Sequence, residues 1–197
     1  TRADTDYKKV PCCRWAHPSM DAAQALMEEN GLHHADVERV EIRTFHYATR
    51  LAGHRPASID ELAYSIAFPV ATMIVRGGFG AREMDAAVLA DQDIIRVSEA
   101  TELIDDAEMT ARSVEKRWAA VTIITKDGAR YEAEPRSARG DVDAPLSEDE
   151  MRDKFHMFAD PVLGRARAEK IRALCLRFDA LDSKEFAGLL DLVLAAP

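Results

Sequence analysis

The sequence is poor in the residues that mark secreted, membrane-spanning and nucleic-acid-binding proteins. It has only three cysteines, which is too few for a disulfide framework and suits a reducing compartment. Its longest apolar run, residues 62–75, is interrupted by polar residues and is shorter than the roughly 20 residues that a membrane-spanning helix needs. Basic residues number 26 against 35 acidic ones, which disfavours nucleic-acid and anionic-membrane surfaces. We therefore predict a cytoplasmic protein with neither nucleic acid nor membrane as a partner.

Cofactor signatures are missing as well. The sequence contains neither the glycine fingerprint of a nucleotide-binding fold nor the Cys/His spacing of a zinc site. We therefore expect no metal and no organic cofactor. Because the net charge is −9, an anionic substrate would need a local basic pocket.

Strand and helix patterns alternate irregularly over the first 144 residues. Residues 37–45 alternate apolar and charged side chains, which predicts a half-buried strand. Residues 117–125 and 129–135 flank an Asp-Gly pair, which is a strong hairpin signal. Helices are expected over 18–30 and over 59–76, the second apolar nearly all round and kinked at its proline. This mixture predicts an α+β fold, a small mixed or antiparallel sheet packed with helices.

The pattern becomes helical only from residue 145 onward. A capping box at Ser147 and Glu150 precedes three amphipathic segments. These segments span residues 148–158, 166–179 and 183–194. We predict two domains, an α+β unit of residues 1–144 and a C-terminal helical segment of residues 145–197.

The richest chemistry lies in residues 8–18, which read KKVPCCRWAHP. The proline at the end of this stretch opens a helix, whose free N–H groups and positive dipole end favour an anion. Lys8 and Arg14 could therefore hold a carboxylate while charge grows on it. The alternative is two solvated cations at the end of a strand.

Three further residues of this stretch have two interpretations each. His17 is either a general acid or base, or a helix cap that orients its neighbours. Cys12 and Cys13 are either nucleophiles or ligands, or they simply pack.

The loop that follows the first predicted strand supplies a second group of candidates. The phenol of Tyr47 either donates to a carboxylate or carries a proton, or its buried ring anchors the loop. His46 and Arg50 are additional candidates from the same loop. Ser65, in the apolar helix, either bonds a backbone carbonyl or faces a cleft.

Four stretches in order resemble the MmgE/PrpD family, which includes 2-methylcitrate dehydratase, cis-aconitate decarboxylase and iminodisuccinate epimerase. Residues 8–23, KKVPCCRWAHPSMDAA, resemble the Lys-x-x-Pro-x-x-x-x-x-His-x-x-x-Asp-Ala-Ala stretch that opens the second domain of these proteins. The later matches are FHYA at 45–48, IDELAYSIAFPVA at 59–71, and RGD with PLS within 139–147.

The resemblance implies roles for particular residues. It implies that Lys8, Tyr47 and His17 are catalytic and that Arg14, Cys13 and His46 bind substrate. In the cis-aconitate decarboxylase branch, the position of Cys13 resembles an active-site histidine, so its absence here argues against decarboxylation. The implied reaction is proton abstraction alpha to a carboxylate of a small di- or tricarboxylate. A lyase similar to 2-methylcitrate dehydratase, in propionate metabolism, is the first candidate and an epimerase or isomerase the second.

The resemblance also implies partners. The family places its other acid and base residues in an N-terminal helical domain, on which the C-terminal helices pack. This sequence begins at Thr1, close to a motif that the family places in mid-sequence. We therefore expect that domain to be missing or to be a separate chain, this chain alone to be inactive, and the assembly to be a homodimer. The alternative is a carboxylate-binding module or a non-catalytic subunit without activity of its own.

Overall fold

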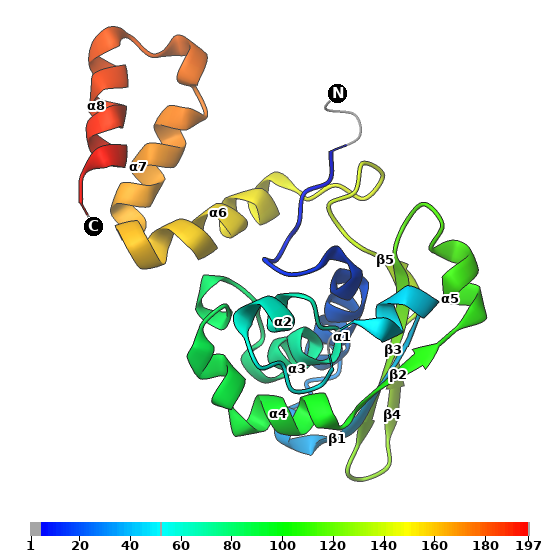
Figure 1. Cartoon of the computed structure of the whole chain (residues 1–197). Helices are drawn as coiled ribbons and strands as arrows, with labels where there is room; N and C mark the ends of the chain where they lie inside the picture. Colours follow the sequence, from blue (N-terminus) through cyan, green and yellow to red (C-terminus); the bar gives the residue numbers. More distant parts are fainter. Residues whose placement is uncertain (1–4, 52, 197) are drawn as a thin grey trace. The chain divides into compact units, whose positions relative to one another are not determined.

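The computed structural model in Figure 1 describes residues 5–51 and 53–196. The chain forms two compact units, Thr1–Leu146 and Ser147–Pro197. The domain roles implied by the resemblance stay predictions.

The first unit contains a mixed five-stranded sheet (Figure 1). Strand β1 (Val37–Thr44) lies between β2 (Thr101–Asp105), to which it is parallel, and β3 (Trp118–Thr125), to which it is antiparallel. Strands β4 (Arg130–Glu132) and β5 (Arg136–Ser137) both pair antiparallel with β3. The sheet and the surrounding helices confirm the predicted α+β class.

One face of the sheet is polar and the other faces the core. In β1, Val40, Ile42 and Thr44 are buried, whereas the intervening side chains carry charge. On the polar face, Glu41 accepts from Arg130 of β4 at 3.0 Å. A register shift near the start of β1 breaks the strict alternation there. The predicted half-buried strand is therefore confirmed.

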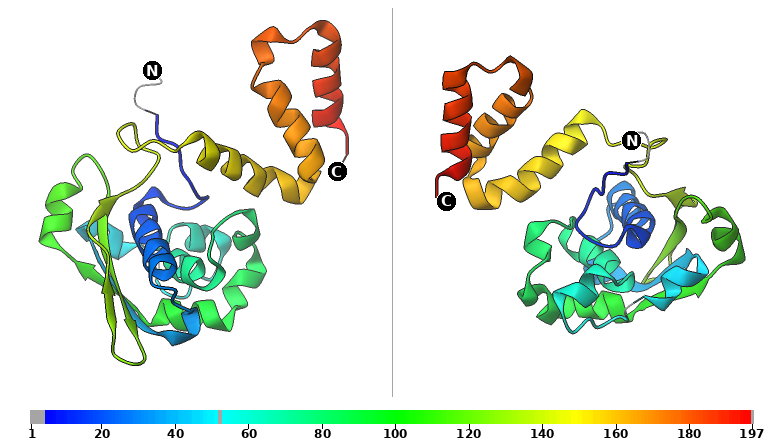
Figure 2. Two further views of the ribbon diagram at one scale, coloured as in Figure 1. Left: turned by 180° about the vertical axis from the view of Figure 1, so that it is seen from behind. Right: turned by 45° about the horizontal axis from the view of Figure 1, so that its top comes forward.

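Helices cover the apolar face of this sheet (Figure 2). Helix α1 (His17–Glu29) packs on β3 and on α3 (Ala67–Arg76), and α3 packs on α4 (Gln92–Glu99). Helix α3 is buried from Ala67 to Ile74, as its apolar sequence predicts. The largest fully buried side chains come from the helices, the sheet and the loops between them: Phe68, Phe79, Met20, Ile42 and Leu62.

The helix predicted over 59–76 is wrong as a single kinked helix, because the structure has two. Helix α2 (Ile59–Ala63) ends before Tyr64, and α3 restarts after Ile66. A proline inside a helix lacks the N–H and clashes with the carbonyl four residues back. Restarting the helix puts Pro69 in the first turn of α3, where its missing N–H is not needed.

Other local expectations agree with the structure. Strands β3 and β4 form the predicted hairpin, with Gly128 at φ +85° in its turn. Ser58 accepts from the N–H of Glu61 at the start of α2, and Gly77 ends α3 with φ +69°. The short helix α5 (Ala107–Arg112), which Asp106 caps, has no counterpart in the prediction.

Over residues 147–196, the second unit contains three α-helices, α6 (Glu148–Leu163), α7 (Arg165–Cys175) and α8 (Ser183–Leu194). They pack in sequence order, α6 on α7 and α7 on α8. Helix α6 extends beyond the predicted residue 158, and α7 ends before the predicted residue 179. The Ser147 capping box is confirmed, since both reciprocal bonds with Glu150 form.

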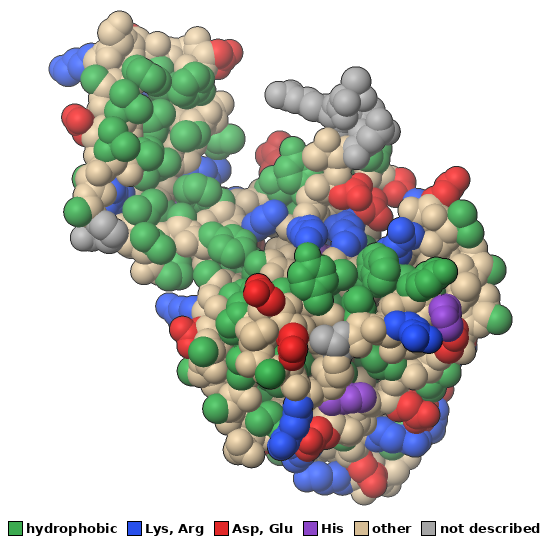
Figure 3. Space-filling model, in the orientation of Figure 1, with side chains coloured by type: hydrophobic (Ala, Val, Ile, Leu, Met, Phe, Trp, Pro, Cys, Tyr) green, Lys and Arg blue, Asp and Glu red, His purple; other side chains and the backbone are tan. Residues whose placement is uncertain are grey.

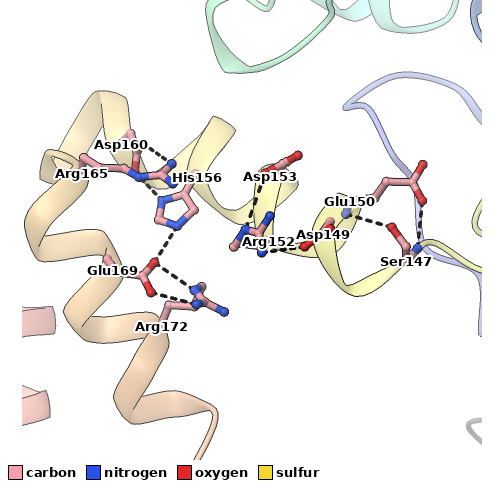
Figure 4. Close-up of polar contacts among 10 residues, drawn as sticks. All are labelled: Ser147, Asp149, Glu150, Arg152, Asp153, His156, Asp160, Arg165, Glu169 and Arg172. Carbon is pink, nitrogen blue, oxygen red and sulfur yellow. Dashed lines mark hydrogen bonds and ion pairs between the residues drawn. The ribbon is translucent and has the colours of Figure 1, made fainter.

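A buried histidine joins two of these helices (Figure 4). His156 of α6 lies between two carboxylates, with Nδ1 at 2.8 Å from Asp160 and Nε2 at 2.9 Å from Glu169 of α7. Glu169 also accepts from Arg172, and Asp160 from Arg165. This network ties α6 to α7 through polar contacts.

Candidate functional site

The stretch before α1 is held as extended chain by backbone hydrogen bonds. Tyr7 N–H donates to the carbonyl of Gly140 at 2.9 Å, and Cys13 N–H donates to the carbonyl of Ala63 at 2.7 Å. A 3-10 turn, η2 (Arg14–Ala16), then leads directly into α1. The chemically rich stretch is therefore anchored at both ends rather than loose.

Arg14 is held by a distant turn. Its guanidinium donates to the carbonyls of Tyr7 at 3.2 Å and Arg139 at 3.0 Å, and it forms an ion pair with Asp141. These contacts bind the segment before η2 to the RGD stretch of the sequence. Since the guanidinium is engaged in this way, substrate binding by Arg14 stays a prediction that requires an exchange of partners.

His17 is a buried, neutral side chain at the start of α1. It is 1% exposed, and burial lowers the pKa of its imidazole to about 4, with the charge of Arg14 adding to the effect. The Cys12 backbone lies close enough to favour the charged ring slightly, yet within the described part of the chain neither ring nitrogen reaches hydrogen-bonding geometry. The catalytic role implied for His17 stays a prediction; in this conformation it lies in the core.

The start of α1 is closed to solvent. Pro18 is the second helical residue rather than the first, and the whole first turn from His17 to Met20 is buried. A carboxylate can reach these N–H groups only if the preceding segment moves. The predicted anion pocket is therefore confined to the side chains that precede the helix.

The two adjacent cysteines differ in environment. Cys12 is buried, its thiol lies 3.6 Å from the sulfur of Met20, and burial raises its pKa to about 12. Cys13 is half-buried. Packing explains Cys12, whereas the substrate contact implied for Cys13 remains a prediction.

The two lysines before the cysteines also differ. Lys9 pairs with Asp21 of α1 at 3.3 Å. The side chain of Lys8 is exposed, and its charge is close enough to add to the lowering of the His17 pKa. Lys8 is thus the more accessible of the two cations.

A second group of predicted residues gathers where two parallel strands end. Strands β1 and β2 pair in register through Thr44 and Asp105, so residues after Thr44 lie beside the end of β2. The short 3-10 helix η4 (His46–Arg50) begins there. Side chains that follow parallel strands meet at one edge of a sheet, which is the usual place for ligands in such arrangements.

His46 and Tyr47 are both exposed at this edge. The Nδ1 of His46 lies 2.6 Å from a carboxylate oxygen of Asp105. The rings of His46 and Tyr47 meet edge to face at 5.4 Å between centroids, and Tyr47 is 69% exposed. An exposed phenol beside an oriented imidazole could exchange protons with a small acid. The alternative of a buried Tyr47 ring that anchors the loop does not fit this exposure.

Two aromatic side chains bring the groups together. Trp15 of η2 packs edge to face on Phe45 at the end of β1, with 5.2 Å between ring centroids. The guanidinium of Arg117 lies over the ring of Phe45, 5.6 Å from its centroid. Through this contact, the stretch before α1 and the η4 turn become neighbours.

An open cavity of about 580 Å³ lies beside Trp15. Its basic residues are Arg14, Lys116 and Arg117, of which Lys116 pairs with Asp143. Acidic side chains also line this cavity. The full lining is Asp6, Arg14, Trp15, Glu115, Lys116, Arg117, Asp141, Val142 and Asp143.

Sequence reasoning missed several residues of this region. Asp105 carries no signal of its own, because only the parallel pairing of β1 and β2 places it at His46. Arg117 is predicted only as the first residue of a strand, and nothing in the sequence singles out Lys116. Ser65 lies in the core, where its hydroxyl donates to the Gly53 carbonyl at 3.2 Å and accepts from Phe68 N–H at 3.3 Å, so it has a structural role.

Two negative results concern the described residues only. Over residues 5–51 and 53–196, His, Cys, Asp and Glu side chains form no group of three or more that could hold a metal ion. Within the same residues, the helices are too short or too polar to cross a membrane.

Comparison with known families gives one clear result. The MmgE/PrpD C-terminal domain matches residues 10–179, which is most of the chain. The search of curated proteins finds no match.

Proposed function

Because the chain belongs to the MmgE/PrpD family, as its C-terminal domain, we propose that it contributes half of an active site for small di- or tricarboxylates. The reaction proposed is removal of a proton alpha to a carboxylate. A lyase similar to 2-methylcitrate dehydratase is the first candidate, and an epimerase or isomerase is the second. The remaining half of the site would come from an N-terminal helical domain in the same protein or in a separate chain.

The contact of Trp15 with Phe45 is the observation that carries this proposal. It links the segment that carries Lys8 and Arg14 to the turn that carries His46 and Tyr47, and Arg14 and Trp15 line a cavity of about 580 Å³. Cavities of roughly 300–1,000 Å³ suit small-molecule ligands. Removing a proton next to a carboxylate builds negative charge, which cations and a phenol can stabilise.

The role proposed for each residue follows from whether its side chain is exposed or buried. Lys8 and Tyr47 are exposed and would stabilise the enediolate as it forms, and Cys13 and Arg14 would line the substrate. His17 is buried and neutral, so its proposed part is to shape the start of α1 unless the segment opens. No cofactor takes part in the proposed reaction.

A turnover assay tests the proposal. The chain is assayed alone and with a helical domain from a related enzyme, against 2-methylcitrate, cis-aconitate, citrate and iminodisuccinate. We expect activity only with the partner, and a loss of roughly 100-fold or more in Lys8→Ala and Tyr47→Phe. Matched controls are Lys170→Ala and Tyr64→Phe, which change exposed side chains elsewhere.

A second candidate, a carboxylate-binding module or non-catalytic subunit, makes a different prediction. Calorimetry would then show a carboxylate binding to the chain in a Lys8-dependent way, with no turnover in any mixture. Activity of the wild-type mixture that survives both substitutions would contradict the proposed site.

A further inference from the structure

The pair formed by His46 and Asp105 has a geometry beyond that of a simple surface ion pair. Exposed ion pairs between flexible side chains contribute little to stability. Here the histidine is fixed at three points. Its backbone N–H donates to Thr110 Oγ1 at 2.9 Å, its carbonyl accepts from Thr49 Oγ1 at 2.7 Å, and its Nδ1 lies 2.6 Å from Asp105.

The fixed points leave one ring nitrogen for chemistry. A carboxylate at Nδ1 favours the tautomer that carries its proton there, so Nε2 keeps its lone pair. Within the described residues, Nε2 of His46 has no hydrogen-bonding partner. The imidazole is about half exposed, with 46% of its side chain accessible. Its free nitrogen is therefore available to a ligand.

The strand register explains why the carboxylate is in place. Asp105 is the last residue of β2 and pairs with Thr44, two residues before His46. The N–H of Asp106 donates to the carbonyl of Thr44 at 3.0 Å and extends this pairing by one step. The neighbouring Asp106 is used differently, since it caps α5 and lies 3.4 Å from Arg43. Asp105 is thus the carboxylate directed at the imidazole.

We propose that His46 is a proton-transfer residue of this site and that Asp105 is its positioning residue. The inference rests on the proposed function and deepens it, because it assigns the base. Figure 3 shows basic, acidic, histidine and apolar side chains exposed on this face of the first unit, which suits a polar ligand. The ligand class is a small acid with a C–H bond alpha to a carboxylate.

The step balances without a further reactant. The Nε2 lone pair of His46 takes the alpha proton, and the electron pair of the C–H bond moves into an enediolate on the neighbouring carboxylate. In a dehydration, that pair then forms the C=C bond and expels the beta hydroxyl. The imidazolium returns its proton to this hydroxyl, and water leaves. In an epimerisation, the carbon is reprotonated instead.

Two measurements test the assignment. Nitrogen-15 NMR of the imidazole in the full chain should show the Nδ1–H tautomer of His46, and Asp105→Asn should move the proton to Nε2, because an amide can donate to Nδ1. Turnover of the chain with a helical partner should fall at least 100-fold in kcat in His46→Gln and in Asp105→Asn, with KM within about threefold.

The matched control is Asp106→Asn, which changes the adjacent carboxylate but keeps a good helix cap. It should retain kcat within about threefold and leave the His46 tautomer unchanged. Circular dichroism should show the same fold in all three variants, because His46 and Asp105 are exposed and an asparagine at position 106 still caps α5.

The outcomes separate the two proposals. An active wild type whose kcat survives both His46→Gln and Asp105→Asn overturns this inference and leaves the proposed function intact. An Nε2–H tautomer in the wild type also overturns it. Absence of turnover in every wild-type mixture overturns the proposed function and, with it, the role of His46.

Discussion

Asp141 forms an ion pair with Arg14, a residue that precedes it by 127 positions. Both side chains are largely buried, with 15% and 14% exposed. The same guanidinium also donates to two backbone carbonyls, so it fastens the turn around residue 141 to the segment before α1. This turn therefore stabilises the part of the chain that carries Lys8 and the cysteines.

Removing either partner should destabilise the first unit. Asp141→Asn leaves a largely buried guanidinium without its countercharge, which costs about 2–4 kcal/mol. Denaturant unfolding measures the loss, and a double-mutant cycle with Arg14→Gln gives the coupling between the two side chains. Arg39→Gln, which removes a half-exposed cation from the outer face of the sheet, should cost about 0–1 kcal/mol. Equal losses in Asp141→Asn and Arg39→Gln would contradict the proposed fastening role.

Gly140 should not tolerate a side chain. Its φ is +92°, and a Cβ there would lie 1.9 Å from the carbonyl oxygen of Tyr7. Gly140→Ala must therefore displace the segment that pairs with it, and we expect a loss of more than about 2 kcal/mol of unfolding free energy.

Gly78→Ala serves as the control for this substitution. A Cβ at Gly78 meets nothing within 4 Å, so its stability should stay within about 1 kcal/mol of wild type. Thermal unfolding compares the two variants directly. An unchanged midpoint in Gly140→Ala would show that the segment before α1 is not held as described.

His17 should make the first unit sensitive to mild acid. Its pKa is about 4 in the folded chain against 6.5 for the free side chain, because burial disfavours the charged ring. Between these values the unfolded state binds more protons, so stability falls as the pH is lowered from about 6.5 to 4. The shift corresponds to about 3 kcal/mol.

His17→Leu should flatten this part of the pH profile. Leucine has no ring nitrogens to leave unpaired in the core and cannot be protonated there. Unfolding free energies at pH 7 and pH 4.5 measure the slope, and His33→Asn, at an exposed position, controls for the other titrating groups. A profile of His17→Leu that is as steep as that of the wild type would disprove the assignment.

Local signals in the sequence account for much of the fold. The Asp-Gly turn, the Ser58 and Ser147 caps and the Gly77 stop depend on a few neighbouring residues, and each is found where it is predicted. The predicted kink at Pro69 is not found, because the helix restarts two residues before this proline. The sequence does not show whether the chain kinks or restarts there, because this depends on the contacts of Ser65 with a distant loop.

The site is less predictable because it depends on pairings between distant segments. Asp105 reaches His46 only through the register of two parallel strands, and a slip of one residue would turn Asp105 to the opposite face. The ion pair of Arg14 with Asp141 likewise joins segments that lie far apart in the sequence, so the sequence does not reveal it. Residue type and resemblance predict His46, Tyr47 and Lys8 as site residues, whereas the contact of His46 with Asp105 is seen only in the structure.

The polar link between α6 and α7 should weaken in strong acid. The hydrogen bond from Arg172 holds the pKa of Glu169 at about 2. The pKa of Asp160 is also lowered, because its carboxylate accepts hydrogen bonds from His156 and Arg165. A carboxylate with a lowered pKa contributes stability above its unfolded pKa, and this contribution is lost as the pH falls through the folded value. We expect loosening of α6 from α7 between about pH 4.5 and 2.

Hydrogen exchange of the α7 amides at pH 5 and pH 2.5 checks this expectation. Glu169→Gln should raise exchange already at pH 5, when corrected for intrinsic rates, and should reduce the further rise in acid. Asp191→Asn, near the end of α8, should behave like wild type. Identical exchange in Glu169→Gln and wild type at both pH values would mean that the network in Figure 4 does not hold the helices together.

The second unit exposes apolar side chains that should drive self-association. Figure 3 shows them as a broad green area over α7 and α8. The exposed members include Leu176, Phe178, Phe186, Leu190, Val193 and Leu194. Contiguous apolar surface of this kind is usually covered by another protein surface. We therefore expect the isolated chain to bind a hydrophobic dye and to sediment as more than a monomer at micromolar concentration.

Leu190→Lys with Leu194→Lys should reduce both effects. The two side chains lie on α8 and are exposed, so lysine can replace them without disturbing the helix. Ala187→Lys adds a single charge to the same helix and controls for charge alone. If the apolar surface drives association, the double variant becomes monomeric whereas the control does not. A wild-type chain that sediments as a monomer and binds no dye would show that this surface is not adhesive in the free chain, and its cover would then have to be sought within the unit itself.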